Sequence, residues 1–195
     1  MIRFTSLIIL LLCSSCIQLG GEPQPTRFYL LEAVTESSLA QQSKPIQLEL
    51  SPIAFPSYLD RPQIVSRTAE NAILIADHDR WAEPLPDNLT RTLQENLFQQ
   101  LPAIRISSAP WAPRSGPTFV VKLMINRFDG VIGQQTDVDI RWSLISGDNN
   151  TELHREHYRA QLPVGDGYQN FISGLNSALA GLSQNIAIAL LAIQK

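Results

Sequence analysis

The sequence has little cysteine, histidine and charge, and each shortage narrows what the chain can do. Its 195 residues include two cysteines, three histidines and nearly balanced charges, with 15 basic and 18 acidic residues. This balance indicates neither a nucleic-acid surface nor a polybasic membrane patch. The sequence has no G-x-S-x-G elbow, no phosphate-binding loop and no dinucleotide fingerprint. We therefore expect no enzyme, no cofactor and no nucleic-acid partner.

The N-terminal residues form an apolar run that ends in small residues and a cysteine. The run 7–12 is too short to cross a bilayer. Ser14-Ser15-Cys16 after it resembles the lipobox of bacterial lipoproteins, although Cys13 stands where that box usually has Leu. An ordinary secretory signal with two incidental cysteines is the alternative. Cleavage before Cys16 leaves one cysteine whose sulfur is already a thioether, so no disulfide is expected.

Three segments follow from this signal. We expect residues 1–15 to be a signal peptide and Cys16 to be the lipidated first residue of the mature chain. Residues 16–25 then form a short tether, and residues 26–195 form a single periplasmic domain. In the sorting rule for such lipoproteins, Asp after the lipidated cysteine retains the protein in the inner membrane. Ile17 stands there, which predicts the periplasmic face of the outer membrane.

The hydrophobic pattern predicts a mixed α/β domain. Apolar residues alternate in segments that we expect to be strands, at residues 26–32, 46–50, 63–67, 72–76, 104–107, 119–128, 138–144 and 153–162. Leucines at intervals of four predict a helix from about residue 85 to 101, and a second helix is expected over 166–194. We expect a polar turn at 77–80, a hairpin turn at 129–135, and loops at 35–43 and 110–117. This order of elements implies an α/β fold with a mixed sheet.

The residues that carry chemistry predict no catalytic or metal site. His154 and His157 lie three apart in an expected strand, which places them on opposite faces. Asp137 and Asp139 share a face, but no third ligand lies nearby in the sequence, and a solvated face is favoured over a metal site. Residues 77–79, Asp-His-Asp, fit a surface turn better than a base with its orienting partner.

The last helix is unusual because residues 167–194 include no charged side chain. The side opposite its main apolar stripe is polar at first and becomes apolar at Ile188 and Leu191. Small residues form a further line at Gly174, Ala178 and Gly181. Either the rest of the domain buries this helix on two sides, or part of it is an interface. A transmembrane helix is a poor interpretation, because Gln184 and Asn185 interrupt the apolar run.

The interior resembles a known family. The segment 58–67, Tyr-Leu-Asp-Arg-Pro-Gln-Ile-Val-Ser-Arg, followed by Trp-Ala-Glu-Pro-Leu at 81–85, is similar to the signature of ABC-type transport auxiliary lipoproteins, the PqiC-like group. The opening strand Arg-Phe-Tyr-Leu-Leu at 27–31 fits the same family. The resemblance implies a three-layer α/β/α sandwich that is anticodon-binding-domain-like. It also implies a non-catalytic role beside MCE-type periplasmic proteins, which carry lipid between the membranes, and their inner-membrane components.

Five residues are candidates for contact with a partner or with a second copy in a homo-oligomer: Asp60, Arg61, Trp81, Ile188 and Leu191. Asp60 and Arg61 belong either to a structural turn fixed by the next proline or to a binding loop. Trp81 is either a lid packed over the helix start or an exposed anchor. Two other functions stay open: a carrier that binds lipid in its own cavity, and an envelope hydrolase.

Overall fold

The computed structural model describes residues 24–34, 45–108 and 119–193. The expected signal peptide, Cys16, and the loops at 35–43 and 110–117 lie outside these ranges. The described elements follow one another as β1 (Arg27–Tyr29), β2 (Ile46–Leu50), the 3₁₀ helix η2 (Ser57–Leu59), β3 (Gln63–Arg67), β4 (Ile73–Trp81), α2 (Leu85–Gln100), β5 (Ile104–Ser108), β6 (Phe119–Val131), β7 (Gln135–Ser146), β8 (Glu152–Pro163) and α3 (Gly167–Ile193).

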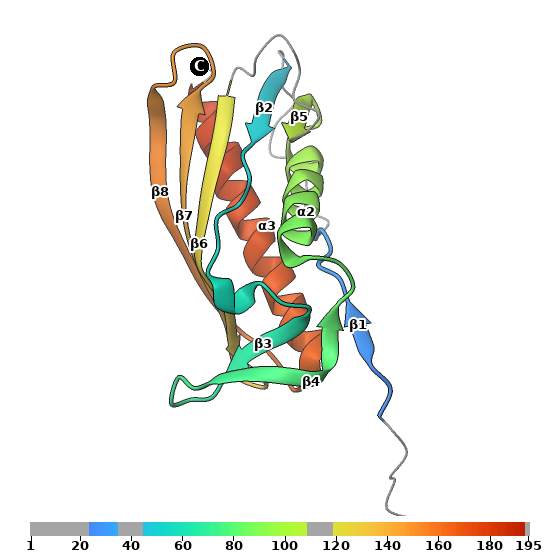
Figure 1. Ribbon diagram of the computed structural model, residues 1–195. Helices are drawn as coiled ribbons and strands as arrows, with labels where there is room; N and C mark the ends of the chain where they lie inside the picture. The colour runs from blue at the N-terminus through green and yellow to red at the C-terminus, as the bar shows by residue number, and fades with distance from the viewer. Residues whose placement is uncertain (1–23, 35–44, 109–118, 194–195) are drawn as a thin grey trace, which may run out of the picture.

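A five-stranded mixed sheet forms the long side of the molecule (Figure 1), in the order β5-β2-β6-β7-β8. β2 runs parallel to both β5 and β6, whereas β6, β7 and β8 form an antiparallel meander. Val121, Leu123 and Ile125 of β6 are buried, while Lys122 and Met124 between them are exposed. This alternation is the period of two that the sequence predicted, so one face of the meander packs on the core and the other faces water.

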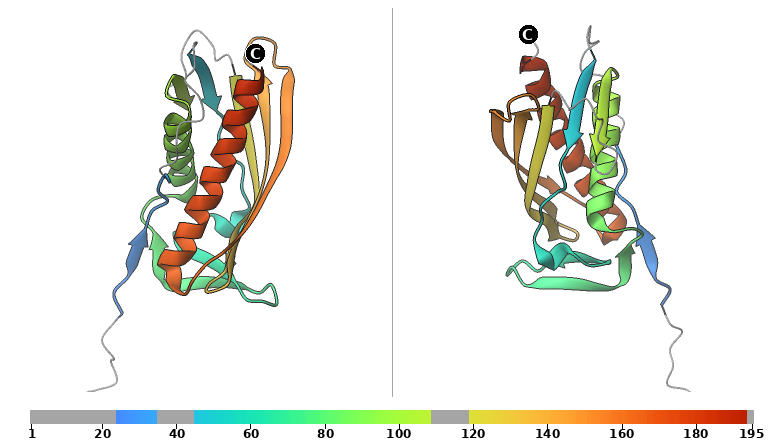
Figure 2. Two further views of the ribbon diagram at one scale, coloured as in Figure 1. Left: turned by 180° about the vertical axis from the view of Figure 1, so that it is seen from behind. Right: turned by 45° about the horizontal axis from the view of Figure 1, so that its top comes forward.

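The two helices pack against each other, and α3 crosses the buried face of the meander (Figures 1 and 2). The leucine stripe of α2 is buried as predicted, at Leu89, Leu93 and Leu97. The α/β class with a mixed sheet is confirmed. The opposite face of β6, β7 and β8 carries charged side chains such as Lys122, Asp139 and Arg159. The three-layer order that the family resemblance implied stays a prediction. The anticodon-binding-domain relation stays a prediction.

A second sheet of three strands, β1-β4-β3, closes one end of the molecule (Figure 1). The strands predicted at 63–67 and 72–76 are confirmed as β3 and the first part of β4, and they pair as an antiparallel hairpin. The expected polar turn at 77–80 is wrong, because β4 continues through it to Trp81. β1 lies parallel to this second half of β4, with Arg27 opposite Asp79. The polar segment 77–80 is therefore a strand because it pairs with β1, whose Arg27 is 52 residues from Asp79 in the sequence.

Glycines let α3 approach its own sheet closely. A Cβ on Gly174 would lie 2.5 Å from a methyl group of Val164 and 2.9 Å from that of Thr136, and a Cβ on Gly181 would lie 2.5 Å from the hydroxyl of Tyr158. Such distances are too short for ordinary packing. The small-residue line predicted in the sequence therefore accommodates side chains of β7 and β8 and the segment after β8, in the same chain.

Candidate functional site

One buried carboxylate joins residues 58–67, which include most of η2 and all of β3 and which we call the η2–β3 motif, to the large sheet. Asp129 of β6 is fully buried and accepts hydrogen bonds from the Tyr58 hydroxyl at 2.7 Å and from Arg67 Nε at 2.9 Å. Arg127 Nε lies 2.7 Å from the same carboxylate, and Arg127 also pairs with Asp137 at 3.0 Å. Because a buried carboxylate is unfavourable without such partners, this set of side chains fixes the position of the motif.

The electrostatics of this cluster match a structural role. Burial raises the pKa of Tyr58 to about 12, and the hydrogen bond to Asp129 acts in the same direction, so the hydroxyl is a neutral donor at physiological pH. The Arg67 guanidinium also lies over the Tyr58 ring, 5.5 Å from its centroid, in the range of a cation–π contact. Tyr58 and Arg67, at the two ends of the motif, therefore stabilise the fold. The middle of the motif lies at the surface.

Asp60 and Arg61 are the middle of that motif. Asp60 ends η2, and its backbone N–H donates to the carbonyl of Ser57 at 3.1 Å. Its side chain is exposed. Arg61 is half-buried, and its Nε has no hydrogen-bond partner among the described residues. The backbone of Asp60 and Arg61 therefore forms the structural turn that was one of the two predictions. Among the described residues, the Asp60 carboxylate and the Arg61 Nε have no hydrogen-bond partner, so both side chains remain available for binding.

Trp81 does not belong to this surface. Only 6 % of it is exposed, so the indole packs in the core and is no exposed anchor. Two positions earlier, Asp79 is buried and accepts hydrogen bonds from Arg27 Nε at 2.7 Å and the Tyr29 hydroxyl at 2.9 Å. Burial raises the pKa of Asp79, but the hydrogen bonds from Arg27 and Tyr29 outweigh it and hold the pKa below its usual range. These bonds attach β1 to β4.

The open face of the meander carries a second charged cluster around Asp139. Asn126, His157 and Arg159 each contact its carboxylate, at 2.7, 2.8 and 3.0 Å. Burial raises the pKa of Asp139, but these hydrogen bonds outweigh it and lower the pKa below its usual range. Neighbouring Asp137 is only 4 % exposed, so the predicted solvated face is wrong at that position. The donors to Asp137 come from both neighbouring strands and from its own strand: Arg127 of β6, Gln161 of β8 and Gln135 of β7.

The two histidines lie on opposite faces of β8, as the spacing predicted. His154 faces the helix side, where its ring centroid is 5.1 Å from that of Trp142. His157 lies on the open face beside Asp139. Among the described residues, no three His, Cys, Asp or Glu side chains are placed to hold a metal ion.

The last helix presents two large apolar side chains to water: Ile188, which is 53 % exposed, and Ile193 at its end, which is 38 % exposed. Leu191 is half-buried and packs on the core. Ser173, Ser177 and Gln184 precede Ile188 at helical spacing and are exposed or half-buried, and we call these four residues the free line of α3. By length and composition α3 is also long enough to cross a membrane, but half of its apolar stretch is buried inside the protein, as in a core helix.

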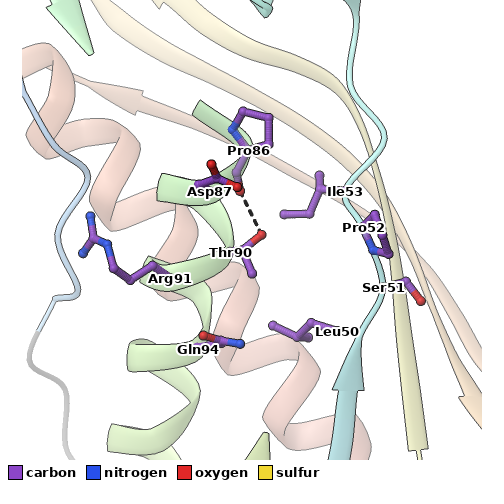
Figure 3. Close-up of a pocket in the computed structure, with 9 residues that line it drawn as sticks. All are labelled: Leu50, Ser51, Pro52, Ile53, Pro86, Asp87, Thr90, Arg91 and Gln94. Atoms are coloured by element: carbon purple, nitrogen blue, oxygen red, sulfur yellow. Dashed lines mark hydrogen bonds between the residues drawn. The ribbon is translucent and has the colours of Figure 1, made fainter. Parts of the chain in front are cut away.

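Shallow clefts mark the surface of the described residues. One of about 420 Å³ lies between Leu50–Ile53 and the first turns of α2, and Asp87, Thr90 and Gln94 line it on the helix side. The guanidinium of Arg91 points away from the chain after β2 (Figure 3). Thr90 there donates to the Pro86 carbonyl at 2.8 Å and so serves its own helix. The lining mixes apolar and charged groups and contains no nucleophile paired with a base.

Comparison with known proteins identifies the family. The sequence model of the ABC-type transport auxiliary lipoprotein component matches residues 29–187. The chain belongs to this family. Intermembrane transport lipoproteins PqiC from Escherichia coli and Shigella flexneri are each 24 % identical to it over 159 residues, which is 81 % of each chain. The PqiC-like resemblance is thereby confirmed.

Solved structures support the fold. A crystal structure of an uncharacterised protein superposes with a TM-score of 0.71 at 23 % identity, covering 86 % of this chain and 99 % of the other. A protein from Xanthomonas campestris gives the same TM-score at 12 % identity, covering 87 % and 99 %. At such identities the likeness concerns the fold alone.

Sequence reasoning missed two features of this family member. Asp129 was expected to begin a hairpin turn, yet it is the centre of the buried cluster. The sequence held one indication of this. Apolar residues alternate from Phe119 to Ile125, and Arg127 and Asp129 then occupy the positions at which this alternation would place apolar residues. The second feature is the exposed segment Ile73–Ile75. Its signal was a run of three apolar residues where one buried face needs only every second position.

Proposed function

We propose that this protein is a non-catalytic auxiliary subunit of an MCE-type lipid transport system, anchored to the periplasmic face of the outer membrane and supporting envelope integrity. The observation that carries the proposal is the family match over residues 29–187, with the lipobox-like Ser14-Ser15-Cys16 a short distance upstream. The auxiliary role follows from the family description. The MCE partner follows from the PqiC-like resemblance and is the part that experiment must test.

The anchor is proposed at Cys16, with residues 1–15 removed and residues 16–25 acting as a tether. Three acyl chains would bind far more strongly than one, at about 0.8 kcal/mol per buried CH₂. We predict that Cys16→Ala yields an unprocessed or mislocalised precursor. Mass spectrometry of the mature wild-type chain provides the direct check, and an unmodified thiol at Cys16 would refute the anchor.

The partner surfaces are proposed at two places that leave groups free in the described fold: the Asp60–Arg61 turn and the free line of α3 with Ile188. An uncharged polar surface offers hydrogen bonds without the desolvation cost of Lys or Glu. Its occupant is either an MCE-domain protein or a second copy in a homo-oligomer. Leu191, which packs on the core, would contribute by supporting this surface.

A photo-crosslinking residue placed in intact cells distinguishes these surfaces from the rest. We expect the residue to capture a partner when it replaces Ile188 or Asp60. Met124, which is 48 % exposed on the open face of β6, is a matched control position. Capture of an MCE-domain protein or a second copy at Ile188 or Asp60 supports the proposal. Equal capture at Met124, or no capture at the two test positions, contradicts it.

The alternatives receive less support. The clefts found in the described residues measure about 380–460 Å³, are open to solvent and have mixed polar and apolar linings, whereas acyl chains require an enclosed apolar cavity. Phospholipid retained by the purified and delipidated protein would revive the carrier hypothesis. For a hydrolase, His154 and His157 each pair with a carboxylate, and no serine hydrogen-bonds to either among the described residues. Turnover of ester or glycan substrates would revive that hypothesis.

A further inference from the structure

Three consecutive apolar residues are exposed at one end of the molecule. Ile73, Leu74 and Ile75 of β4 are 40, 48 and 46 % exposed. Neighbouring residues of a strand point to opposite faces, so both faces of the hairpin are apolar and open to water here. β1 pairs only with residues 79–81 of β4, so within the described sheet Ile73–Ile75 have β3 on one side and an open edge on the other. Open edges of soluble proteins usually carry charge or are covered, and an apolar surface left open is typical of a site that meets an apolar partner.

The hairpin that carries these residues is well fixed. Thr68 closes its turn, with its N–H donating to the Ala72 carbonyl at 2.9 Å and its hydroxyl accepting from the N–H groups of Glu70 and Ala72 at 3.2 Å. At the end of β3, directly before the turn, Arg67 is bound to buried Asp129. The apolar side chains are therefore presented on a stiff support, and little ordering would be needed when they bind.

The position of the hairpin relative to the N-terminus indicates its partner. Figures 1 and 2 show the β3–β4 hairpin at the end of the molecule from which β1 leads to the N-terminus. Phe28 of β1, 65 % exposed, belongs to the same small sheet. Eight residues, 16–23, separate the proposed lipid from Gln24, and they span at most about 30 Å. A lipid at Cys16 thus keeps this end of the molecule near the membrane.

We propose that the small sheet rests on the lipid leaflet that holds the anchor, with Ile73, Leu74, Ile75 and Phe28 entering the boundary between headgroups and acyl chains. This inference rests on the proposed lipidation of Cys16. The exposed polar residues Glu70 and Asp77 flank the apolar run on the hairpin and limit the depth of insertion. Because the two arginines of the hairpin, Arg67 and Arg80, are outnumbered by the acidic residues Glu70, Asp77 and Asp79, the attraction is apolar and does not require anionic lipid.

A fluorescent label on the hairpin tests the contact in the full lipoprotein. In the processed chain Cys16 is acylated and Cys13 has been removed, so Leu74→Cys supplies the one reactive thiol for an environment-sensitive nitrobenzoxadiazole label. Asn149→Cys is the matched control, because it lies in the β7–β8 turn at the opposite end of the molecule (Figure 1). Both proteins are reconstituted into vesicles of phosphatidylethanolamine and phosphatidylglycerol, and into vesicles of neutral phosphatidylcholine.

In both kinds of vesicle we expect the Leu74→Cys label to shift to shorter emission wavelength and to be quenched several-fold more by spin-labelled lipid than by aqueous iodide. The control label should behave in the opposite way. Ile75→Cys gives a second position should Leu74→Cys misfold. A label that stays accessible to iodide on protein that floats with the vesicles overturns this inference and leaves the anchor intact. So does a label shielded equally without vesicles, which indicates a protein partner or a second copy.

Failure of the anchor has its own signature. Protein that does not float with vesicles and whose Cys16 has an unmodified mass refutes the proposed lipidation, and this inference falls with it.

Discussion

Replacing Ile188 with aspartate separates an interface on α3 from ordinary burial within the domain. Ile188 is 53 % exposed, so about half of its side chain contacts the protein. Complete burial of an isoleucine contributes about 1.5–3 kcal/mol, and half of that is lost on substitution. Helix propensity adds a few tenths of a kcal/mol. We therefore expect Ile188→Asp to lower the free energy of unfolding by about 1–2 kcal/mol, which leaves the domain folded.

Leu190→Asp is the internal comparison, because Leu190 lies two residues away on the same helix and is fully buried. A carboxylate there would be buried without a partner, which costs several kcal/mol in addition to the lost apolar contacts. Since small domains are stable by about 5–15 kcal/mol, this variant should lose most of its folded population. One helix thus supplies both an interface probe and a folding control.

Circular dichroism and thermal melting measure folding, and light scattering together with pull-down of the partner measures assembly. For a domain of this size, 1–2 kcal/mol corresponds to a decrease in Tm of about 2–8 °C. We expect Ile188→Asp to melt within that range while self-association or carrier binding is lost. If the folded variant assembles as well as the wild type, the free line of α3 is not an interface. If it unfolds like Leu190→Asp, the exposure of Ile188 is not its native state.

Three further predictions concern the fold itself. Asp129→Asn should lower the free energy of unfolding by about 3 kcal/mol in urea titrations, because two arginines lose a buried carboxylate. Tyr58→Phe removes only a hydrogen bond and should lower it by about 1–2 kcal/mol. Equal effects would mean that the charge of Asp129 is unimportant. Gly174→Ala should lower stability by about 1–3 kcal/mol through overpacking against two β-branched side chains, and an unchanged urea midpoint would contradict this. The pKa of Asp79 is lowered in the fold, so the stability that its carboxylate contributes is present above the unfolded pKa of about 3.9 and is lost as pH falls below it. The difference in Tm between wild type and Asp79→Asn should therefore narrow between pH 5 and pH 2. A constant difference would exclude the ion pair with Arg27.

The elements that the sequence predicted correctly depend on local periodicity. The leucines of α2 recur every four residues, and the apolar residues of β6 and β7 recur every two, so each pattern specifies its own element and its buried side. The same reasoning placed His154 and His157 on opposite faces of β8. The pair of motifs that carries the family resemblance is also a local signal. The lipobox-like Ser14-Ser15-Cys16 is local too, and the lipid anchor that it indicates stays a prediction.

What failed depends on partners that are distant in the sequence. Residues 77–80 form a polar segment that becomes part of β4 because β1 pairs with it. Asp129 is buried because Arg67, 62 residues earlier, supplies its donor. Neither outcome is contained in a window of ten residues, because burial of a charge is decided by which donors the rest of the chain brings to it.

The sequence by itself therefore determined the family and most of the order and period of the strands and helices, because these are encoded in neighbouring residues. Only the tertiary structure decided which parts of these elements stay exposed. It packed the small-residue line of α3 against β7, β8 and the segment after them, and left Ile188 in water. It also placed the apolar residues Ile73–Ile75 in the same small sheet as β1, the first described strand, because sheet pairing over long sequence separations fixes which surfaces face solvent.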